Sequence, residues 1–489
     1  MQNMKNIYKI MVVLAAVIAT AACKKSDSCS ITFPVAGAFV QDWGQTTTVK
    51  FNTVNVKQVD ITSVTGGWSA EVDLATKTIK VTAPESAEAE NAAKSASITL
   101  SAISSGGSSA GAILSAYIID GEINLSEQGT ANCYIITKPN TKYRFDVTRK
   151  GEEGDRLATA DIGIVWQSAT GLIKYLTFND GYAEFFAEYE SGSTTEVKNG
   201  NLLIAAYNDA GDIIWSWHLW FTKSDPRDEA QQSQNRVVFM QRNLGAYDNS
   251  DGSTDTAEIL DSYGLYYQWG RKDPFPRPAT YNCANNSDEI LYSGSGSRVY
   301  VSIEESDAKR GNIAYTIANP TVFITSTPDN GGDWLYGHRD DSLWSDHDGS
   351  GRNKSVYDPC PYGWQVPGAN DFAGLRLAEE EDNMDLELAK KTFGWFLTDS
   401  ENQKYFYTGA GYRSYYNGIL SNVNYKDQYP YTPVPWVGYY WTQGISGANG
   451  VAMFFDLNTT RATINAFEPR TPQYRANAMQ VRCVKSAGR

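Results

Sequence analysis

The sequence is poor in histidine, in closely spaced cysteines and in positive charge. It has three histidines and six cysteines, and no two of these cysteines stand in a CxxC arrangement. Structural zinc is usually held by Cys/His clusters of that spacing, so neither a zinc site nor a His-rich metal centre is expected. The excess of Asp and Glu over Lys and Arg gives a formal net charge of −14. This charge argues against nucleic acid and against electrostatic docking on anionic lipid.

Motifs of known catalytic chemistry are also missing from the C-terminal half. Residues 236–489 contain no GxSxG, no HExxH and no P-loop, the patterns typical of serine hydrolases, zinc peptidases and nucleotide-binding enzymes. The acidic residues are plentiful, but nothing marks two of them as a glycosidase pair. The sequence therefore predicts a non-enzyme without an organic cofactor, and calcium is the single ion considered below.

The first 22 residues have the pattern of an export signal. Two lysines precede an apolar run, Ile10 to Ile18, that is too short to span a bilayer comfortably. The run leads to TAAC, which resembles a lipobox ending at Cys23. We therefore expect removal of residues 1–22, a lipid on Cys23 and an outer-membrane lipoprotein that faces the cell surface. An ordinary secretory peptide cut nearby is the alternative.

Residues 23–35 are expected to form a linker and residues 36–120 a first β-sandwich. Short runs in which apolar and polar residues alternate predict half-buried strands separated by turns. These runs are TVKFNTVNV, KQVDITSV, WSAEVDLATKTIKVTA and SASITLSAIS. An immunoglobulin-like sandwich is the simplest fold for this pattern, and its simplest role is that of a spacer.

Residues 121–225 are expected to form a second sandwich from seven strands. The candidate strands are TANCYIIT, KYRFDVTR, DIGIVWQS, LIKYLTF, YAEFFAEY, NLLIAAYN and DIIWSWHLWFT. In the last strand Ile213, Trp215, Trp217 and Leu219 share one apolar face, which should point to the core. His218 lies on the other face, and we interpret it as a structural histidine within an aromatic strand. The polar residues 226–235 are then expected to be a linker.

The third domain, residues 236–489, is organised around the stretch VYDPCPYGWQVP, Val356 to Pro367. Because proline fixes its own φ and restricts the preceding residue, Asp358 to Pro361 should form a rigid extended corner. Cys360 lies in this corner, and the single cysteine after it is Cys483 in a near-terminal strand. A disulfide between these two is the preferred pairing. The remaining cysteines, Cys29, Cys133 and Cys283, are expected to be buried thiols.

Several pieces of this third domain resemble the FISUMP domain (Fibrobacter succinogenes major paralogous domain), found in lipoproteins of Bacteroidota. The matching pieces, in order, are QRNLGA (Gln241 to Ala246), YGLYYQWGRKDPFP (Tyr263 to Pro276), KSVYDPCPYGWQVP (Lys354 to Pro367), GYYWTQG (Gly438 to Gly444) and VRCVK (Val481 to Lys485). The N-terminal modules are similar to the immunoglobulin-like and BACON-like domains that precede it. The resemblance implies a mainly β chain: two immunoglobulin-like sandwiches followed by an α+β, C-type-lectin-like FISUMP domain. It brings no catalytic residue to carry over.

One clear helix is expected after this corner, within residues 368–393. Asn370 or Asp371 is a plausible N-cap, and Phe372, Leu375 and Leu377 share one helical face.

Function is expected in two long segments of the third domain, residues 282–350 and 414–436. Both are rich in tyrosine, tryptophan and polar residues, which give large rigid contact areas with polar tips. Sugar rings would stack on the aromatic faces while their hydroxyls bond to carboxylates or amides. The candidate ligand-binding residues are Trp334, Tyr336, Trp344, Asp333, Asp340, Tyr415, Tyr429 and Trp436. Packing of these loops onto their own domain is the alternative.

The segment DHDGSG suggests a calcium loop. Asp346, Asp348 and Ser350 fall at positions 1, 3 and 5 of an EF-hand loop. Position 12, however, is Tyr357 in place of the bidentate glutamate. A solvated acidic turn is therefore the alternative to a calcium site.

The sequence thus predicts a surface lipoprotein that acts as an adhesin or glycan-binding protein. Its partners would be the membrane, through the lipid, and a polysaccharide or a glycan on a host or partner cell. A fimbrial tip, accessory or structural envelope protein, with fimbrial or envelope proteins as partners, is one alternative. A carbohydrate-active enzyme of C-type-lectin-like fold is the second.

Overall fold

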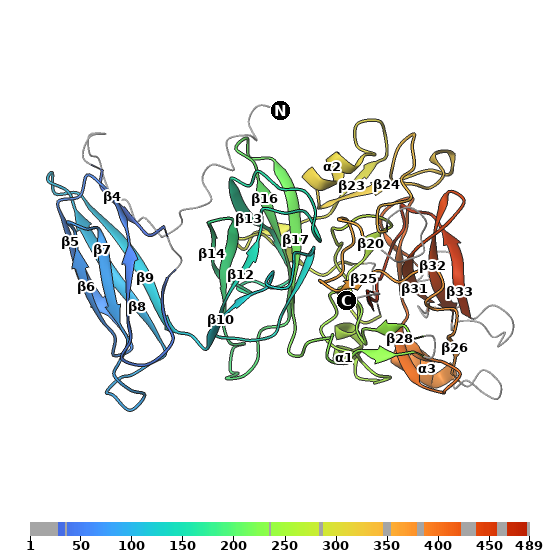
Figure 1. The fold of residues 1–489 in the computed structure, drawn as a ribbon, viewed down its shortest axis with the longest axis horizontal. Coiled ribbons are helices and arrows are strands. Elements are labelled where there is room, and N and C mark those ends of the chain that lie inside the picture. The colour runs from blue at the N-terminus through green and yellow to red at the C-terminus, as the bar shows by residue number, and fades with distance from the viewer. Residues whose placement is uncertain are drawn as a thin grey trace. The chain divides into compact units, whose positions relative to one another are not determined.

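The structure is a computed structural model that describes residues 28–34, 37–233, 236–282, 287–345, 354–378, 386–421, 437–456 and 467–486. The described residues are mainly β (Figure 1). The chain divides into two compact units. The first comprises residues 1–124, 139–145 and 173–189, and the second comprises residues 125–138, 146–172 and 190–489.

The first unit contains the predicted N-terminal sandwich. One sheet has the order β2 (Ala38–Val40), β9 (Ser109–Ile118), β8 (Ser95–Ile103) and β5 (Gln58–Val64), and the other has the order β3 (Thr46–Lys50), β7 (Thr78–Thr82) and β6 (Ser69–Asp73). A further pair joins β1 (Ser30–Thr32) to β4 (Asn52–Val54). Ile98 and Leu100 of the first sheet share one buried core with Ile79 and Val81 of the second. The alternating sequence pattern therefore predicted these strands correctly, because each strand buries one face.

A four-stranded sheet completes the first unit. Its order is β10 (Gly121–Asn124), β12 (Thr141–Asp146), β15 (Tyr182–Ala187) and β14 (Lys174–Asn179), with β10 and β12 parallel. A small aromatic cluster of Tyr117, Ile119 and Phe186 packs with Phe39 and Tyr175. The hydroxyls of Tyr117 and Tyr175 lie 2.9 Å apart, which gives these two buried polar groups a hydrogen bond.

The second unit begins with a six-stranded sheet. Its order is β11 (Cys133–Ile136), β17 (Ile213–Phe221), β16 (Gly200–Tyr207), β13 (Asp161–Gln167), β21 (Leu291–Tyr292) and β22 (Arg298–Val299). All seven strands predicted between residues 121 and 225 are present, but β12, β14 and β15 belong to the first unit. The predicted domain boundary at residue 225 is wrong, because β21 continues the sheet by pairing Tyr292 with Gln167.

Strand β17 is buried on both faces, and the predicted one-sided burial is therefore wrong. Trp215, Trp217, His218 and Trp220 are each at most 1% exposed. His218 Nε2 lies 2.8 Å from the Asn201 side-chain oxygen, and burial lowers the His218 pKa to about 3. The interpretation of His218 as a structural residue is confirmed.

Residues 226–233 of the predicted linker 226–235 are a packed part of the second unit. Glu229 accepts a hydrogen bond of 2.9 Å from the buried guanidinium of Arg242. The short strand β18 (Gln231–Gln232) pairs with β19 (Val238–Phe239). The linker prediction is wrong because polar composition alone does not reveal these pairings, which lie further along the chain.

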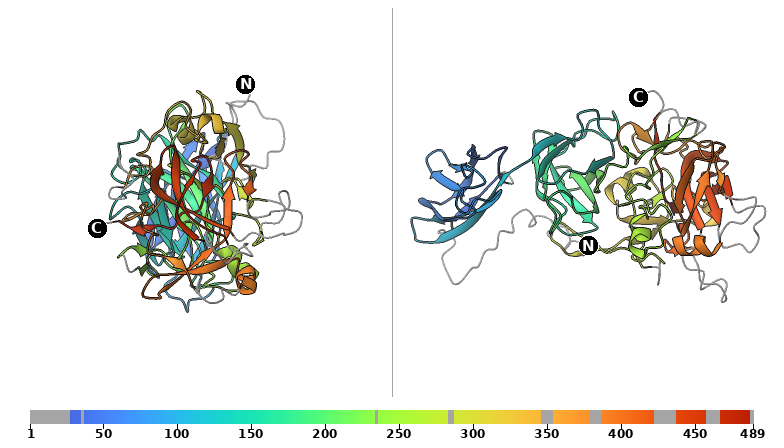
Figure 2. Two further views of the ribbon diagram at one scale, coloured as in Figure 1. Left: turned by 90° about the vertical axis from the view of Figure 1, so that its right-hand side faces the viewer. Right: turned by 90° about the horizontal axis from the view of Figure 1, so that it is seen from below.

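The remaining sheets hold the motifs of the C-terminal half. The four-stranded sheet is β18, β19, β35 (Val484–Lys485) and β25 (Trp364–Gln365). The largest is β20 (Tyr267–Gln268), β34 (Ala478–Met479), β29 (Ala410–Arg413), β31 (Val437–Ser446), β32 (Asn449–Asp456) and β33 (Phe467–Gln473), with β30 (Leu420–Ser421) paired to β29. Strands β31, β32 and β33 run side by side (Figure 1, Figure 2). Pro469 and Pro472 in β33 are suited to its place at the sheet edge, since proline cannot donate a ladder hydrogen bond.

Two smaller sheets and the helices complete the described part of the second unit. The sheets are β23 (Ser302–Glu305) with β24 (Val322–Thr325), and β26 (Arg376–Leu377), β27 (Gly394–Thr398) and β28 (Lys404–Thr408). The helices are α1 (Thr256–Asp261), α2 (Ile313–Ala318), the 3₁₀ turn η3 (Pro328–Asn330) and α3 (Leu386–Thr392). Over the described ranges, no helix has the length and apolar character needed to cross a membrane.

Within the described residues, α3 is the one α-helix in the segment 368–393. Asn370 and Asp371 do not cap it, because the chain from Gly368 forms turns before it enters β26 at Arg376. The Asp371 carboxylate accepts a hydrogen bond from the Gly368 N–H at 2.6 Å, three residues before it. Phe372, Leu375 and Leu377 do share one core cluster. Their spacing predicts one face of a helix, but in the structure turns and the strand β26 bring these three side chains together.

Candidate functional site

The predicted proline corner is held by the expected disulfide. Cys360 is bonded to Cys483, which lies 123 positions further along the sequence, and their Cα atoms are 6.1 Å apart. After Cys360 the chain makes a turn, in which the Trp364 N–H donates to the Pro361 carbonyl at 3.0 Å. Strand β25 then pairs Trp364 with Lys485 and Gln365 with Val484. The bridge therefore joins the corner to the last strand, as the sequence indicated. Cys133 is a buried free thiol, as predicted, and Cys29 is a half-buried one.

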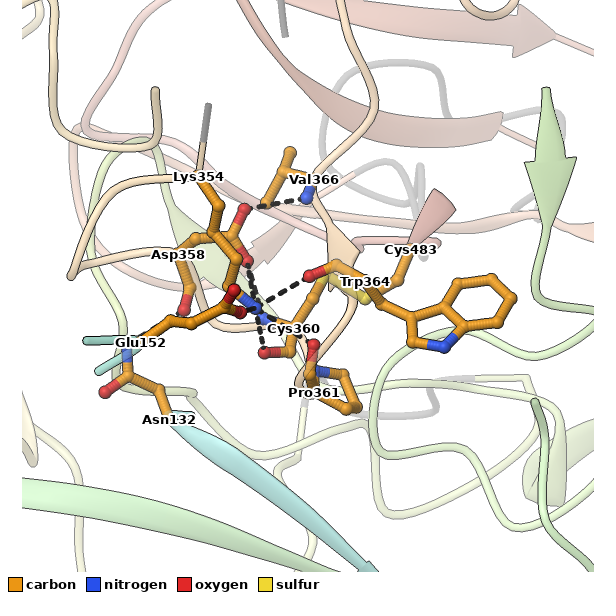
Figure 3. The surroundings of a disulfide bond; sticks show 9 residues. All are labelled: Asn132, Glu152, Lys354, Asp358, Cys360, Pro361, Trp364, Val366 and Cys483. Carbon is orange, nitrogen blue, oxygen red and sulfur yellow. Dashed lines mark hydrogen bonds and ion pairs between the residues drawn. A yellow bond between two sulfur atoms is a disulfide. The ribbon is translucent and has the colours of Figure 1, made fainter. Parts of the chain in front are cut away.

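The corner is built around the ammonium group of Lys354 (Figure 3). Lys354 Nζ donates to the carbonyl oxygens of Cys360, Pro361 and Trp364 at 2.6, 3.0 and 2.7 Å. Two buried carboxylates form ion pairs with it, Asp358 at 3.5 Å and Glu152 at 3.6 Å. Since three N–H groups meet three carbonyls, Lys354 fixes the shape of the corner.

Asp358 ties the two ends of the corner together. Its carboxylate oxygens each accept one main-chain N–H at 2.8 Å, from Cys360 and from Val366. Burial raises its pKa, although Lys354 opposes this shift. The corner is therefore a rigid support, and its charged groups are occupied by one another.

The other family-like motifs meet in the same core. Met240 and Leu244 donate main-chain hydrogen bonds to Cys483 and Val481 at 3.0 and 2.8 Å. The indole N–H of Trp441 donates to the Tyr267 carbonyl at 2.8 Å. Pieces that are far apart in sequence thus form one contiguous interior, which is a structural role.

Two of the predicted ligand-binding residues are part of this interior. Trp334 is 1% exposed and Trp344 is fully buried. Their indole N–H groups donate to the carbonyls of Trp269 and Arg271 at 2.8 and 3.2 Å. The prediction of a ligand surface is wrong for both tryptophans, because packing and these hydrogen bonds already use both rings.

Asp333 and Asp340 are brought together by one arginine. Arg475 Nη1 lies 4.0 Å from the Asp333 carboxylate and donates to the Asp340 carbonyl at 3.0 Å. Arg475 Nη2 also binds the Asp341 carboxylate. Asp333 is itself buried, and burial raises its pKa to about 6, because desolvation outweighs the Leu335 N–H and the Arg475 charge. Arg475 thus contacts the carboxylates of Asp333 and Asp341 and the main chain of Asp340, and Asp340 is closer to the surface than Asp333.

Tyr474, which precedes Arg475, belongs to a short row of three tyrosine rings. We call this row, Tyr416, Tyr415 and Tyr474, the tyrosine row. The ring centroids of Tyr415 and Tyr474 are 4.5 Å apart, and those of Tyr415 and Tyr416 are 6.5 Å apart. Tyr416 is 67% exposed. Gly332 lies against the Tyr474 ring, where an added Cβ would come within 2.2 Å of it. A glycine is therefore needed at this close approach.

The tyrosine row is fixed from both sides of Tyr415. The Tyr415 N–H donates to the Asn477 side-chain oxygen, and its carbonyl accepts the Ser326 N–H, both at 2.8 Å. Of the predicted residues, the structure thus brings Tyr415 close to the segment of Asp333 and Asp340. Tyr416 and Tyr474 were missed as sites. Tyr416 lies in the tyrosine-rich segment 414–436, which the sequence does indicate, but nothing in the sequence marks Tyr474.

The other predicted sites are distributed as follows. Tyr336 is 46% exposed and its N–H donates to the Gly311 carbonyl at 2.9 Å. Among the described residues, no group of three His, Cys, Asp or Glu side chains is placed to hold a metal ion. The predictions that lie outside the described residues are those for Tyr429, Trp436, Asp346, Asp348, Ser350, Cys23 and Cys283.

Comparison with known proteins adds little. No family model and no curated protein matches the sequence. Solved structures that align with part of the chain include the D00-D0 domain of intimin, at 10% identity over 39% of this chain and 96% of that one, with a TM-score of 0.16. A protocadherin gammaB7 EC3-6 structure aligns at 9% identity over 43% and 54%, and the human desmocollin-1 ectodomain at 11% over 44% and 45%, each with a TM-score of 0.15. The chain spans about half of these last two. TM-scores at this level carry no argument about fold or function.

Proposed function

We propose that the chain is a lipid-anchored protein of the bacterial cell surface that binds saccharide through the tyrosine row. The observation that supports this proposal is the row itself: an exposed ring, Tyr416, continues into two half-buried rings, Tyr415 and Tyr474. The residue after Tyr474, Arg475, binds the Asp341 carboxylate. Flat aromatic faces can stack on the C–H faces of a sugar, and the neighbouring oxygens can accept its hydroxyl groups.

Rigidity favours binding at this place over the other exposed tyrosines. Hydrogen bonds on both sides hold the Tyr415 backbone, and the Gly332 contact holds the Tyr474 ring. Binding of a ligand that stacks on the row would therefore cost little conformational entropy of the protein.

The remaining parts of the proposal rest on the sequence. The TAAC pattern supports a lipid on Cys23 and an outer-membrane location facing outward. The five motif pieces support membership of the second unit's C-terminal part in the FISUMP family. The first unit's sandwich would then act as a spacer that carries the binding part away from the membrane.

The test is a glycan-array screen of the chain from residue 24 onward, which lacks only the export signal and the lipidated cysteine. The Tyr416→Ala variant should lose binding, because its ring is the exposed end of the row. Tyr300→Ala is the matched control, since Tyr300 is 68% exposed and lies outside the row. Both variants should melt at the wild-type temperature.

Each other outcome points to a rival. If reducing ends are released from a bound polysaccharide, the chain is a carbohydrate-active enzyme. If no glycan is retained at all, saccharide binding is excluded and the fimbrial or envelope-structural function takes its place.

A further inference from the structure

Two buried groups of opposite charge in the second unit lie close together without a hydrogen bond between them. Asp333 is 6% exposed and Arg475 is 1% exposed. Arg475 Nη1 lies 4.0 Å from Asp333 Oδ2, which is too far for a hydrogen bond. Among the described residues, neither Asp333 Oδ2 nor Arg475 Nε has a hydrogen-bond partner. Unpaired buried groups are costly, and here two complementary ones stand next to each other.

The guanidinium of Arg475 is instead engaged on the side that is nearer the surface. Its Nη2 binds the carboxylate of Asp341, a side chain that is 34% exposed. Its Nη1 donates to the Asp340 carbonyl at 3.0 Å. Water can replace the guanidinium at the half-exposed Asp341, but it cannot hydrate the buried Asp333. The charge of Asp333 therefore decides which of the two carboxylates needs Arg475 more.

The charge of Asp333 is set by burial and by a few neighbours. Its Oδ1 accepts the Leu335 N–H at 3.1 Å. The charged groups that act on it are Arg475 from the opposite segment and Arg339 and Asp341 from its own. Burial outweighs them all and raises the pKa of Asp333 to about 6. Asp333 therefore changes its charge in mild acid.

The inner ring of the tyrosine row is attached to the same two segments. Gly332 directly precedes Asp333, and Tyr474 directly precedes Arg475. An added Cβ at Gly332 would come within 2.2 Å of the Tyr474 ring, and the Ala476 N–H donates to the Gly332 carbonyl at 2.9 Å. Because the backbone at Gly332 already touches the ring, a movement of the neighbouring charged pair displaces Tyr474.

We infer that Asp333 is a proton-controlled switch of the tyrosine row. When Asp333 is neutral, Arg475 stays on Asp341 and the row has the arrangement described above, since an unpaired buried acid costs less than an unpaired buried carboxylate. When Asp333 is ionised, it draws the guanidinium inward by about 1 Å, to hydrogen-bond distance, and Tyr474 shifts with it. Saccharide binding is then stronger in mild acid. This consequence rests on the proposed function, whereas the movement does not.

The first test measures glycan binding to the chain from residue 24 onward at pH 5 and at pH 7. If the neutral form alone binds, its population and the apparent affinity both fall about tenfold over this range. Asp333→Asn cannot ionise and should bind equally at both pH values, although it retains His338 of the same segment. Asp329→Asn is the matched control, since Asp329 is an exposed carboxylate nearby in sequence, and it should keep the wild-type ratio.

The outcomes separate this inference from the proposed function. Equal binding at pH 5 and pH 7 would overturn the switch and leave saccharide binding intact. A pH dependence that persists in Asp333→Asn would also overturn it, because another group would then be responsible. If no glycan is retained at either pH, the proposed function fails, and the second test decides on the switch.

Crystal structures of the same chain at pH 5 and pH 8 test the movement without any ligand. The expected result is that Arg475 binds Asp341 at pH 5 and Asp333 at pH 8, with the Tyr474 ring displaced between the two. Identical contacts of Arg475 at both pH values would overturn the inference, whatever the glycan measurement gives.

Discussion

The side-chain amide of Asn132 donates to the main-chain carbonyl of Asp358 at 2.8 Å, although 226 residues separate the two in sequence. The same amide donates to the Val356 carbonyl at 2.7 Å, and its oxygen accepts the Trp215 indole N–H at 2.9 Å. Next to it, Cys133 forms a parallel bridge with Pro361. The proline corner is therefore anchored to the strands that precede it as well as to the C-terminal strand.

The disulfide should make a large contribution to stability. Replacing both Cys360 and Cys483 by alanine is expected to lower the free energy of unfolding by about 2–5 kcal/mol, because the bridge closes a long loop. Denaturant unfolding of the chain from residue 24 onward, with and without reductant, measures the effect. Cys29→Ala is the control and should change little. Equal stability of the oxidised and reduced wild type would contradict this prediction.

Lys354 should be as sensitive as the disulfide. Lys354→Met leaves Asp358 and Glu152 buried without their cation and three carbonyls without a donor, which should cost about 3–5 kcal/mol. Lys309→Met, at an exposed lysine of the same unit, should stay within about 0.5 kcal/mol of the wild type. Urea unfolding monitored by tryptophan fluorescence compares the two, and a similar midpoint for both would show that Lys354 does not hold the corner.

The buried tryptophans should behave as core residues. Trp334→Ala and Trp344→Ala are each expected to lower the free energy of unfolding by about 3–5 kcal/mol, since each leaves a large cavity. Tyr336→Ala, at a ring that is 46% exposed, should cost less than about 1 kcal/mol. A tryptophan variant with wild-type stability would return that ring to the list of ligand-binding candidates.

Asp333 should make the stability of the second unit fall as the pH rises. Its folded pKa of about 6 lies above the ordinary value of 3.8, so the folded state binds its proton more tightly than the unfolded state does. The benefit is complete below about pH 4 and is lost between pH 4 and 6. Asp333→Asn should therefore be more stable than the wild type at pH 7, by roughly 2–3 kcal/mol.

The comparison between wild type and Asp333→Asn must be made at each pH. His218 acts in the opposite sense, because its depressed pKa means that stability is lost as the pH falls below about 6.5. Both proteins contain His218, so the difference between their unfolding free energies isolates Asp333. A difference that does not change between pH 4 and 7 would contradict the raised pKa.

Features with a local cause were predictable from the sequence. The strands of the first sandwich alternate because each buries one face, and the proline corner follows from the restricted φ of Pro359 and Pro361. The pairing of Cys360 with Cys483 followed from that corner and the position of the last cysteine. The strands and the corner depend on neighbouring residues, and the disulfide was predicted because Cys483 is the single cysteine after Cys360.

Features that depend on distant partners were not predictable. Strands β21 and β22 have two residues each, too few to show any periodicity, yet they extend a sheet begun more than a hundred residues earlier. Trp334 and Trp344 are buried by distant residues, and their indole N–H groups bond to the carbonyls of Trp269 and Arg271. Their own neighbours in sequence do not distinguish them from exposed tryptophans. The row partner Tyr474 likewise comes from a segment far from Tyr415, which no local pattern connects to it.

The division of the chain between its two units has a consequence for biosynthesis. The backbone passes from one unit to the other five times, at residues 124–125, 138–139, 145–146, 172–173 and 189–190. Strand β10 needs β12 as its parallel neighbour, and β12 needs β15. As the chain emerges N-terminus first, this sheet cannot close until Ala187 has appeared. By then strands β11 and β13 of the second unit are already present, but their partners β17 and β16 have not yet appeared. The first unit can therefore be completed once residue 189 has appeared, whereas the second unit has to wait for β35 at the end of the chain.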